Sequence, residues 1–203
     1  MKKFLLILLC GLFFGSVASA DKADLTQIEN YLNNLTSIKA GFVQMASNGG
    51  TAEGKIYISK PSKIRMEYTA PESLLIVGNG DYIIYNDKEL DQITNIDYKD
   101  IPATMILTKK INFNNGDLKV VDFYKDSGQV AVTVEMPKTP SVKPITLIFD
   151  QAPFRLKQWK VIDPQNIEIT VSLFDIEEDI KLERDLFKFD KNTGKSKSKT
   201  QRK

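Results

Sequence analysis

The 203-residue sequence contains no histidine and one cysteine, and its 28 basic residues nearly balance its 26 acidic residues. The lack of histidine removes the usual proton shuttle and zinc ligand, and with it the Ser-His and Cys-His nucleophile pairs of most hydrolases. No Gly-rich phosphate loop followed by lysine supports nucleotide chemistry, so the sequence argues against an enzyme, a metal site or a bound cofactor.

Residues 1–20 have the features of a secretory signal peptide. Lys2 and Lys3 provide the charged start, residues 4–14 form an apolar run, and residues 18–20 read Ala-Ser-Ala, a small-residue cleavage site. A membrane-spanning anchor is the alternative, but the apolar run is shorter than the roughly 20 residues that a bilayer requires. The cysteine, Cys10, lies inside this run, too early to be processed as a lipid acceptor. We therefore expect an exported chain without thiols or disulfides.

Charge is distributed unevenly along the rest of the chain. Residues 21–190 contain 20 basic and 26 acidic residues, whereas residues 191–203 contain six basic residues and no acidic one. We expect residues 21–190 to form one domain and the tail to be a solvated, disordered end. Attraction of the tail to anionic lipid heads or to an acidic partner is the alternative. The acidic body and the export signal argue against a nucleic-acid partner.

One long segment has helical periodicity. Asp24 is a candidate N-cap, and Leu25, Ile28, Leu32 and Leu35 follow at spacings of three or four residues. Polar residues occupy most of the positions between them. The segment is therefore predicted to be an amphipathic helix that lies on a larger apolar surface.

Short alternating runs separated by turn formers fill residues 38–189. Turns are marked by Asn-Gly-Gly at 48–50, Asn-Gly-Asp at 79–81, Asn-Asn-Gly at 114–116 and Asp-Ser-Gly at 126–128. This punctuation predicts ten to eleven strands, with boundaries accurate to about 2 to 4 residues. The predicted ranges are 38–46, 53–59, 63–68, 74–78, 82–86, 89–95, 118–125, 129–136, 144–150, 155–162 and 167–176.

Residues 101–111 interrupt the strand pattern. Pro102 suits a first helical position, and Ile101, Met105 and Ile106 fall on one side, which predicts a short second helix. This helix joins the two halves of the strand series. The simplest architecture is mainly β (α+β), a highly curved antiparallel sheet with helices across its open side.

Alternation assigns long aliphatic side chains to one face of neighbouring strands. Ile56 and Ile58 share one side of their strand, and Ile64, Met66 and Tyr68 share one side of the next. Such residues form the core of an ordinary β-sandwich, and they equally line a hydrophobic cavity. Periodicity alone leaves both interpretations open.

Residues 177–179 form the densest acidic run, Glu-Glu-Asp. Paired carboxylates are the catalytic groups of glycosidases, but consecutive acidic residues more often form a solvated face. We therefore do not expect catalysis there.

Several motifs between residues 31 and 94 resemble the LolA family of periplasmic lipoprotein carriers. The resemblance is strongest in this region and spans most of the chain after residue 20. The motifs are Tyr31-Leu-x-x-Leu35, Phe42-Val-Gln44, Gly54-Lys-Ile-Tyr-Ile-Ser-Lys-Pro61, Lys63-Ile-Arg-Met-Glu-Tyr68, Pro71, Gly80 before Tyr82-Ile-Ile-Tyr85, and Leu90-Asp-Gln-Ile-Thr94.

The resemblance implies an incomplete antiparallel β-barrel whose hydrophobic cavity is covered by a helical lid. It implies a monomeric periplasmic carrier that accepts acylated lipoproteins from an inner-membrane ABC release complex (LolCDE-like) and delivers them to an outer-membrane receptor (LolB-like). A periplasmic lipid- or lipoprotein-binding sensor or regulator on the same fold is the alternative, although such sensors commonly carry an additional domain. The membrane-anchored receptor of this fold is disfavoured by the missing lipid-acceptor cysteine.

The resemblance also assigns roles to single residues. The family usually places an arginine before the proline of its main motif, where it bonds the lid and latches the empty form closed, and here that position is Lys60. An ammonium lacks the planar fork of an arginine, so Lys60 either replaces the latch or extends along the cavity rim. The acyl-chain cavity is expected to be lined by Leu32, Phe42, Ile56, Ile58, Ile64, Met66, Tyr68 and Met105.

Overall fold

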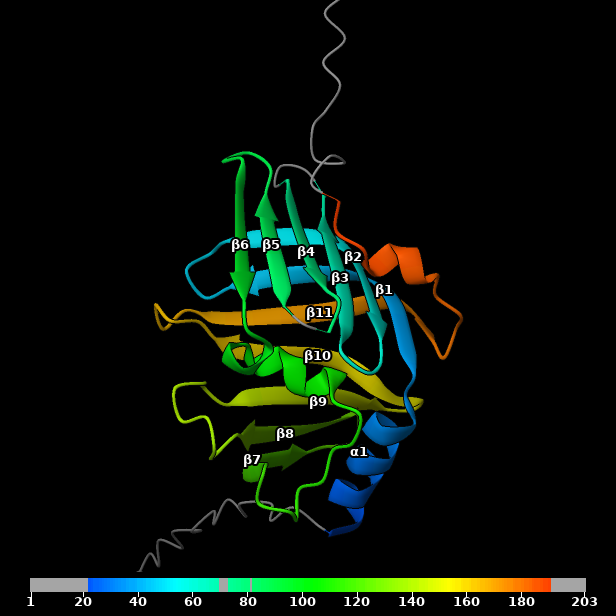
Figure 1. The fold of residues 1–203 in the computed structure, drawn as a ribbon. Coiled ribbons are helices and arrows are strands. Elements are labelled where there is room, and N and C mark those ends of the chain that lie inside the picture. The colour runs from blue at the N-terminus through cyan, green and yellow to red at the C-terminus, as the bar shows by residue number, and fades with distance from the viewer. Residues whose placement is uncertain (1–21, 70–72, 81, 191–203) are drawn as a thin grey trace, which may run out of the picture.

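The computed structural model describes residues 22–69, 73–80 and 82–190. The expected signal peptide at 1–20 and the expected basic tail at 191–203 lie outside these residues, so both remain predictions. Within the described part the chain forms one α-helix, three 3₁₀ helices and eleven strands (Figure 1).

All eleven strands belong to one antiparallel sheet, in the spatial order β6-β5-β4-β3-β2-β1-β11-β10-β9-β8-β7. The predicted mainly β fold with an open, curved antiparallel sheet is confirmed, and the predicted strand series matches the observed one. The strands are β1 (Ser37–Ala46), β2 (Thr51–Ser59), β3 (Lys63–Tyr68), β4 (Leu74–Gly78), β5 (Ile83–Asp87), β6 (Gln92–Ile96), β7 (Lys119–Lys125), β8 (Gln129–Glu135), β9 (Ile145–Gln151), β10 (Phe154–Ile162) and β11 (Glu168–Glu178).

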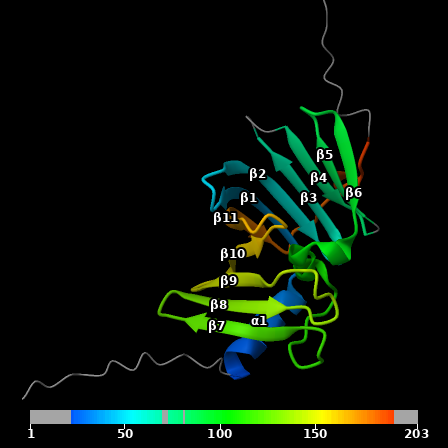
Figure 2. The ribbon, with the colours of Figure 1, turned by 90° about the vertical axis from the view of Figure 1, so that its left-hand side faces the viewer.

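The first and last strands meet in the middle of the sheet. β1 pairs with both β2 and β11, which leaves β6 and β7 as the two edges. The halves β1–β6 and β7–β11 are inclined to each other and enclose a concave face (Figure 2). Register shifts interrupt the pairing of β1, β7 and β10, and such bulges increase local twist, which helps the sheet to bend.

Helix α1 (Lys22–Asn34) packs one apolar stripe against the concave face. Ile28 and Leu32 are fully buried, as the predicted periodicity requires. The expected N-cap is wrong: α1 begins at Lys22, so Asp24 lies inside the first turn. There its carboxylate is still favourably placed near the positive end of the helix dipole, and it forms an ion pair of 2.6 Å with Lys125.

Two short 3₁₀ helices, η1 (Tyr98–Asp100) and η2 (Pro102–Leu107), lie across the open side between the two halves of the sheet (Figures 1 and 2). The longer helix predicted at 101–111 is therefore wrong in type and length, although Pro102 does occupy the start. We call η1 and η2 together the roof.

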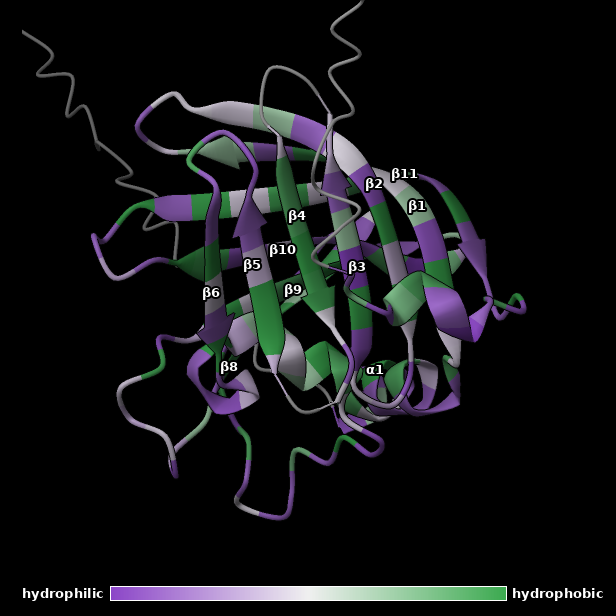
Figure 3. Cartoon of the chain, turned by 45° about the horizontal axis from the view of Figure 1, so that its top comes forward, coloured by the Kyte–Doolittle hydropathy of each residue, from purple (hydrophilic) through white to green (hydrophobic). Residues whose placement is uncertain are grey.

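The core follows from strand alternation on the concave face. Hydrophobic and hydrophilic residues alternate along β1 and β2, whereas β4 is hydrophobic along most of its length (Figure 3). Tyr31 of α1 makes edge-to-face contacts with Phe149 and Phe154, whose rings stack at 5.3 Å. The same cluster of buried side chains runs from α1 across both halves of the sheet to η2.

Candidate functional site

An apolar cavity of about 250 Å³ lies between the concave face of the sheet and η2. Its walls come from both halves of the sheet, and η2 closes it on one side. Because the lining is dominated by aliphatic and aromatic side chains, the cavity suits a hydrocarbon group. The lining residues are Gln44, Ile64, Met66, Tyr68, Ile76, Ile83, Tyr85, Ile96, Ile101, Ala103, Thr104, Leu107, Trp159, Val161, Ile169 and Val171.

Three polar side chains of this lining, Gln44, Tyr68 and Thr104, are hydrogen-bonded within the protein. The Tyr68 hydroxyl donates to Oε1 of Gln44 at 2.9 Å. The Thr104 hydroxyl lies 2.7 Å from the carbonyl oxygens of both Tyr98 and Ile101. Since their hydrogen bonds are made within the fold, these groups place little demand on a ligand for polar contacts.

The period of a 3₁₀ helix explains which side of η2 faces the cavity. Side chains three residues apart are eclipsed in such a helix, and Ile101, Thr104 and Leu107 all line the cavity. The predicted grouping of Ile101 with Met105 and Ile106 assumed an α-helical period. The tighter period instead turns Met105 away from the cavity lining.

Three of the eight expected cavity residues, Ile64, Met66 and Tyr68, line the cavity. The other five are at most 2% exposed and lie outside its lining. They belong to the buried core, where the ring of Phe42 contacts that of Tyr68 edge-on at 5.0 Å. The concave face is thus packed in one part and hollow in another. The five packed residues are Leu32, Phe42, Ile56, Ile58 and Met105.

Sequence reasoning missed the opposite wall, which β10 and β11 provide. Trp159 lies directly across from Val171, and Val161 lies across from Ile169, so the four side chains form two cross-strand pairs. Their i, i+2 spacing was a visible signal. What the sequence does not show is that β11 pairs with β1, which places this wall opposite β3 and β4.

Lys60 connects the β2–β3 turn to α1. Its ammonium group donates a hydrogen bond to the carbonyl of Leu32, close to the C-terminal end of the helix, where a cation is favourably placed. The side chain is partly buried, and this loss of solvation lowers the pKa of Lys60. The latch position of the family therefore contacts α1, and the expected latch role itself remains a prediction.

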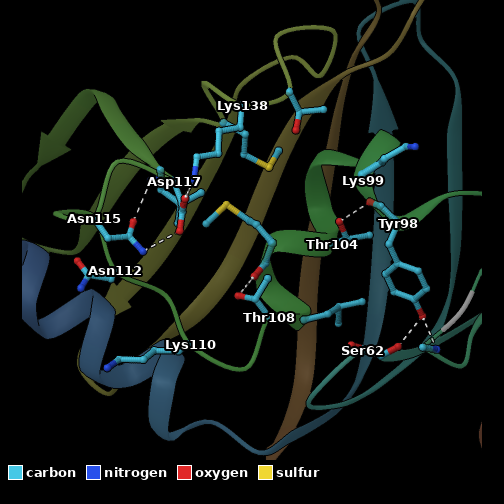
Figure 4. Close-up of a pocket in the computed structure, with 16 residues that line it drawn as sticks. Ser62, Tyr98, Lys99, Thr104, Thr108, Lys110, Asn112, Asn115, Asp117 and Lys138 are labelled. Atoms are coloured by element: carbon cyan, nitrogen blue, oxygen red, sulfur yellow. Dashed lines mark hydrogen bonds and ion pairs between the residues drawn. The ribbon is translucent and has the colours of Figure 1, made fainter.

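A second hollow of about 500 Å³, which we call the outer cleft, adjoins the roof (Figure 4). Thr104 and Leu107 line both the cavity and the outer cleft, so η2 separates the two spaces. Met105 and Met136 also line the cleft, and Lys99, Lys110 and Lys138 are among its polar residues. Space is therefore present on both sides of η2.

Asp117 pairs with Lys138 at 2.5 Å at one side of the outer cleft. The Asn115 amide donates a second hydrogen bond to the same carboxylate at 2.9 Å. The bond from Lys138 is the main reason why the pKa of Asp117 is lowered. The pair is exposed, so it orders this side of the cleft with little effect on overall stability.

Neither a metal cluster nor a membrane-spanning helix is found in the described chain. No three His, Cys, Asp or Glu side chains within residues 22–69, 73–80 and 82–190 gather in a group that could hold a metal ion. Over the same residues, no helix is long and apolar enough to cross a membrane.

Comparison with known proteins places the chain in a family. A Rickettsia prowazekii protein of uncharacterized function is 25% identical over 191 residues, covering 93% of this chain and 88% of that protein. An outer-membrane lipoprotein carrier protein of Pseudomonas paraeruginosa is 26% identical over 195 residues, covering 86% of this chain and 88% of the relative.

The solved structures agree on the fold. A Vibrio parahaemolyticus domain assigned to outer membrane lipoprotein sorting superposes with a TM-score of 0.51 over 84% of this chain and 97% of that domain, at 11% identity. This likeness concerns the fold alone. The family model described as outer membrane lipoprotein carrier protein LolA matches residues 33–190, which include all eleven strands of the described sheet and the whole cavity lining. The chain therefore belongs to the LolA family of outer membrane lipoprotein carriers, which are carriers rather than enzymes.

Proposed function

We propose that this protein is a periplasmic carrier that shields the acyl chains of lipoproteins in the apolar cavity beneath η2. The observation that carries the proposal is the hollow itself: a hydrocarbon-lined space under a short roof, in a member of the LolA family. An acyl chain of about fifteen methylenes costs on the order of 12 kcal/mol to expose to water, at roughly 0.8 kcal/mol each. Free diffusion of lipoproteins through the periplasm is therefore prohibited without such a shield.

The cavity is small for a long acyl chain. Its volume of about 250 Å³ lies below the range of about 300–1,000 Å³ that is usual for small-molecule sites. A long acyl chain therefore requires η2 to move, and the outer cleft offers space for that movement. In this proposal Ile64, Met66 and Tyr68 touch the acyl chain directly, whereas Leu32, Phe42, Ile56, Ile58 and Met105 support the walls and the roof.

The proposed partners are those that the likeness to LolA proteins implies, and the energetics of transfer assigns each a task. An inner-membrane ABC release complex (LolCDE-like) supplies the energy for loading, and an outer-membrane receptor (LolB-like) binds the acyl chains more tightly than the carrier does. The carrier acts as a monomer and needs no cofactor. Any interaction that stabilises the empty, closed form weakens acyl binding and favours delivery.

Native mass spectrometry tests the carrier role. The protein is produced with its N-terminal 20 residues in a Gram-negative host and purified without detergent from a periplasmic extract. We expect a fraction of the protein to carry an adduct whose mass and fragments match an acylated lipoprotein. A preparation that carries only unmodified protein, or only peptides without acyl groups, contradicts the proposal.

Lys60→Leu tests the latch role proposed for Lys60. The variant loses the hydrogen bond to the Leu32 carbonyl, so the closed form is less stable. We expect undiminished lipoprotein binding but slower release to an acceptor in a handover assay. Lys55→Leu, at an exposed position of β2, is the matched control. Unimpaired release by Lys60→Leu would remove the latch role.

A further inference from the structure

Tyr98 of η1 joins two turns of the sheet through one hydroxyl group. The hydroxyl donates to the Ser62 carbonyl in the β2–β3 turn at 2.5 Å and accepts a hydrogen bond from the Gly80 amide, between β4 and β5, at 3.1 Å. Figure 4 shows the ring of Tyr98 directed toward Ser62 with both bonds drawn. The roof is thereby attached to the rim of the N-terminal half of the sheet.

The backbone at Gly78 leaves room for this hydroxyl. A Cβ atom at position 78 would collide with the Tyr98 hydroxyl and with Cγ2 of Ile64, a cavity residue. Glycine at the end of β4 thus permits the close approach of the phenol to the sheet. In the β3–β4 pairing Gly78 lies directly across from Ile64, and it faces Tyr98 of the roof.

Two further contacts connect this attachment to η2. The Ser62 amide donates to the Leu107 carbonyl at the end of η2 at 2.9 Å. The Thr104 hydroxyl, in the middle of η2, lies 2.7 Å from the Tyr98 carbonyl. The Ser62 carbonyl therefore accepts a hydrogen bond from η1, and the Ser62 amide donates one to η2. Because one residue holds both helices, loss of the Tyr98 hydroxyl bond weakens the attachment of the whole roof to the sheet.

We propose that Tyr98 is a positioning residue for cargo binding. Its hydroxyl lies over Gly78 and bonds Ser62 and Gly80, a contact that we call the clasp. The clasp holds the roof over the cavity and so sets how readily an acyl chain enters and leaves. This inference rests on the proposed carrier function. It is distinct from the latch at Lys60, whose ammonium contacts α1 and not the roof. Tyr98 acts through η1 and η2, because it does not belong to the cavity lining itself.

The test compares Tyr98→Phe and Gly78→Ala with Tyr124→Phe. The first removes the hydroxyl and keeps the ring, and the second displaces the hydroxyl. The control, Tyr124→Phe, loses an exposed tyrosine hydrogen bond to Asp126 of 3.1 Å on β7, away from the roof. Thermal unfolding establishes that each variant is folded, and Tyr98→Phe alone decides the matter if Gly78→Ala does not fold.

Two measurements are made on the delipidated chain from residue 21 onward. One is the apparent Kd for pyrene-labelled hexadecanoic acid, and the other is native-state hydrogen exchange at the Ser62 amide, which reports the bond to Leu107. Losing one hydrogen bond changes an opening equilibrium by about 3- to 10-fold. Because apparent affinity scales with the open fraction, we expect Kd to fall and Ser62 exchange to accelerate by that factor in both variants.

Tyr124→Phe is expected to behave like the wild type. The double variant Tyr98→Phe with Gly78→Ala is expected to change no more than Gly78→Ala alone, because the added Cβ already displaces the Tyr98 hydroxyl. A Tyr98→Phe variant whose Ser62 amide exchange rate and Kd for the labelled fatty acid both equal those of the wild type would contradict the proposed clasp. A wild-type protein that fails to bind the probe argues against the carrier function, while exchange at Ser62 still decides whether the clasp exists.

Discussion

Ile76 and Ile58 are isoleucines of the same half of the sheet, but their surroundings differ. Ile76 of β4 lines the cavity, whereas Ile58 of β2 is 1% exposed and lies in the packed core. A larger side chain at position 76 enters empty space, while one at position 58 meets atoms. This contrast allows the hollow to be tested one residue at a time.

We expect Ile76→Phe to lower the affinity for pyrene-labelled hexadecanoic acid by about 10-fold or more, with a stability change below about 1.5 kcal/mol. Ile58→Phe should instead lose about 1–3 kcal/mol, because overpacking forces the core apart. Urea unfolding and a fluorescence titration give the two quantities. If Ile76→Phe and Ile58→Phe lost equal stability, and Ile76→Phe bound the labelled fatty acid like the wild type, the ligand would not use the space at position 76.

Single-residue orientation was predictable from the sequence, but packing was not. Alternation placed Ile56, Ile64 and Met66 on the concave side correctly. Whether a concave side chain touches a neighbour or faces a void depends on the distance across the fold, which local sequence does not encode. The acidic run was expected to be a solvated face, and Glu177 and Asp179 are indeed exposed. The sequence does not show that the Asp179 carboxylate accepts hydrogen bonds from the amide and hydroxyl of Thr36, which lower the pKa of Asp179.

Among the elements, the β2–β3 hairpin depends on a glycine for its close pairing. A Cβ atom at Gly54 would collide with the Glu67 carbonyl of β3 and approach the ring of Phe42. The colliding atom is backbone, so the two strands would have to separate. Gly54 lies opposite Tyr68, so such a separation would reach the cavity wall.

We expect Gly54→Ala to lower the free energy of unfolding by about 2 kcal/mol, in the range typical of overpacked sites. Gly128→Ala is the control, because the nearest atom to its added Cβ would be Oδ1 of Asp126 at 3.8 Å, an ordinary contact. The control should change stability by no more than about 0.5 kcal/mol. Urea denaturation measures both, and a Gly54→Ala variant as stable as the control would contradict the proposed collision.

Turn residues made the strand elements predictable, and short helices were the weak point. β6 begins at Gln92 and not at 89, because Oδ1 of Asp87 accepts hydrogen bonds from the amides of Glu89 and Leu90 and holds a turn there. The helix at 101–111 was expected because Ile101, Met105 and Ile106 fall on one side at an α-helical period. Only the structure shows which of the two periods η2 adopts.

For the whole molecule, the two ends of the described chain are joined through Tyr31. Its hydroxyl donates to Oε1 of Glu178 at 2.5 Å and accepts from the Leu156 amide at 2.9 Å, linking α1 to β10 and β11. Burial is the main reason why the pKa of Tyr31 is raised, and the hydrogen bond to Glu178 adds to it. The folded protein therefore keeps this proton under alkaline conditions in which the unfolded chain loses it.

The sign of the pH dependence follows from this difference. The stabilisation by Tyr31 is complete below the unfolded pKa of 10.0 and decreases as the pH rises above it. We expect Tyr31→Phe to be about 1–2 kcal/mol less stable than the wild type at pH 8, because the Leu156 amide loses its partner. The difference in the free energy of unfolding between the variant and the wild type should narrow between pH 10 and 11 when urea unfolding is measured over a pH series. A gap that stays constant over this range would exclude Tyr31 as the titrating group.

The global arrangement was the least accessible from sequence. The resemblance to LolA proteins predicted an unclosed barrel, and alternation supplied its strands, but the β1–β11 pairing joins segments more than 120 residues apart. That pairing is set by the packing of the finished core and by no local signal. It is also what brings the missed wall of Trp159 and Val161 to the cavity.

The connection between the two edge strands has a mechanical consequence. Residues 97–118 run from β6 to β7, and a chain of this length can extend to roughly 75 Å, at about 3.3–3.6 Å per residue. Within this connection η1 and η2 are compact 3₁₀ turns that rise only about 2.0 Å per residue, so the connection holds length in reserve. In the proposed carrier, the width of the opening between the two sheet edges is therefore limited by the noncovalent contacts of the roof and not by the length of this connection. We expect a bulkier cargo to enter by releasing more of these contacts while every strand stays paired.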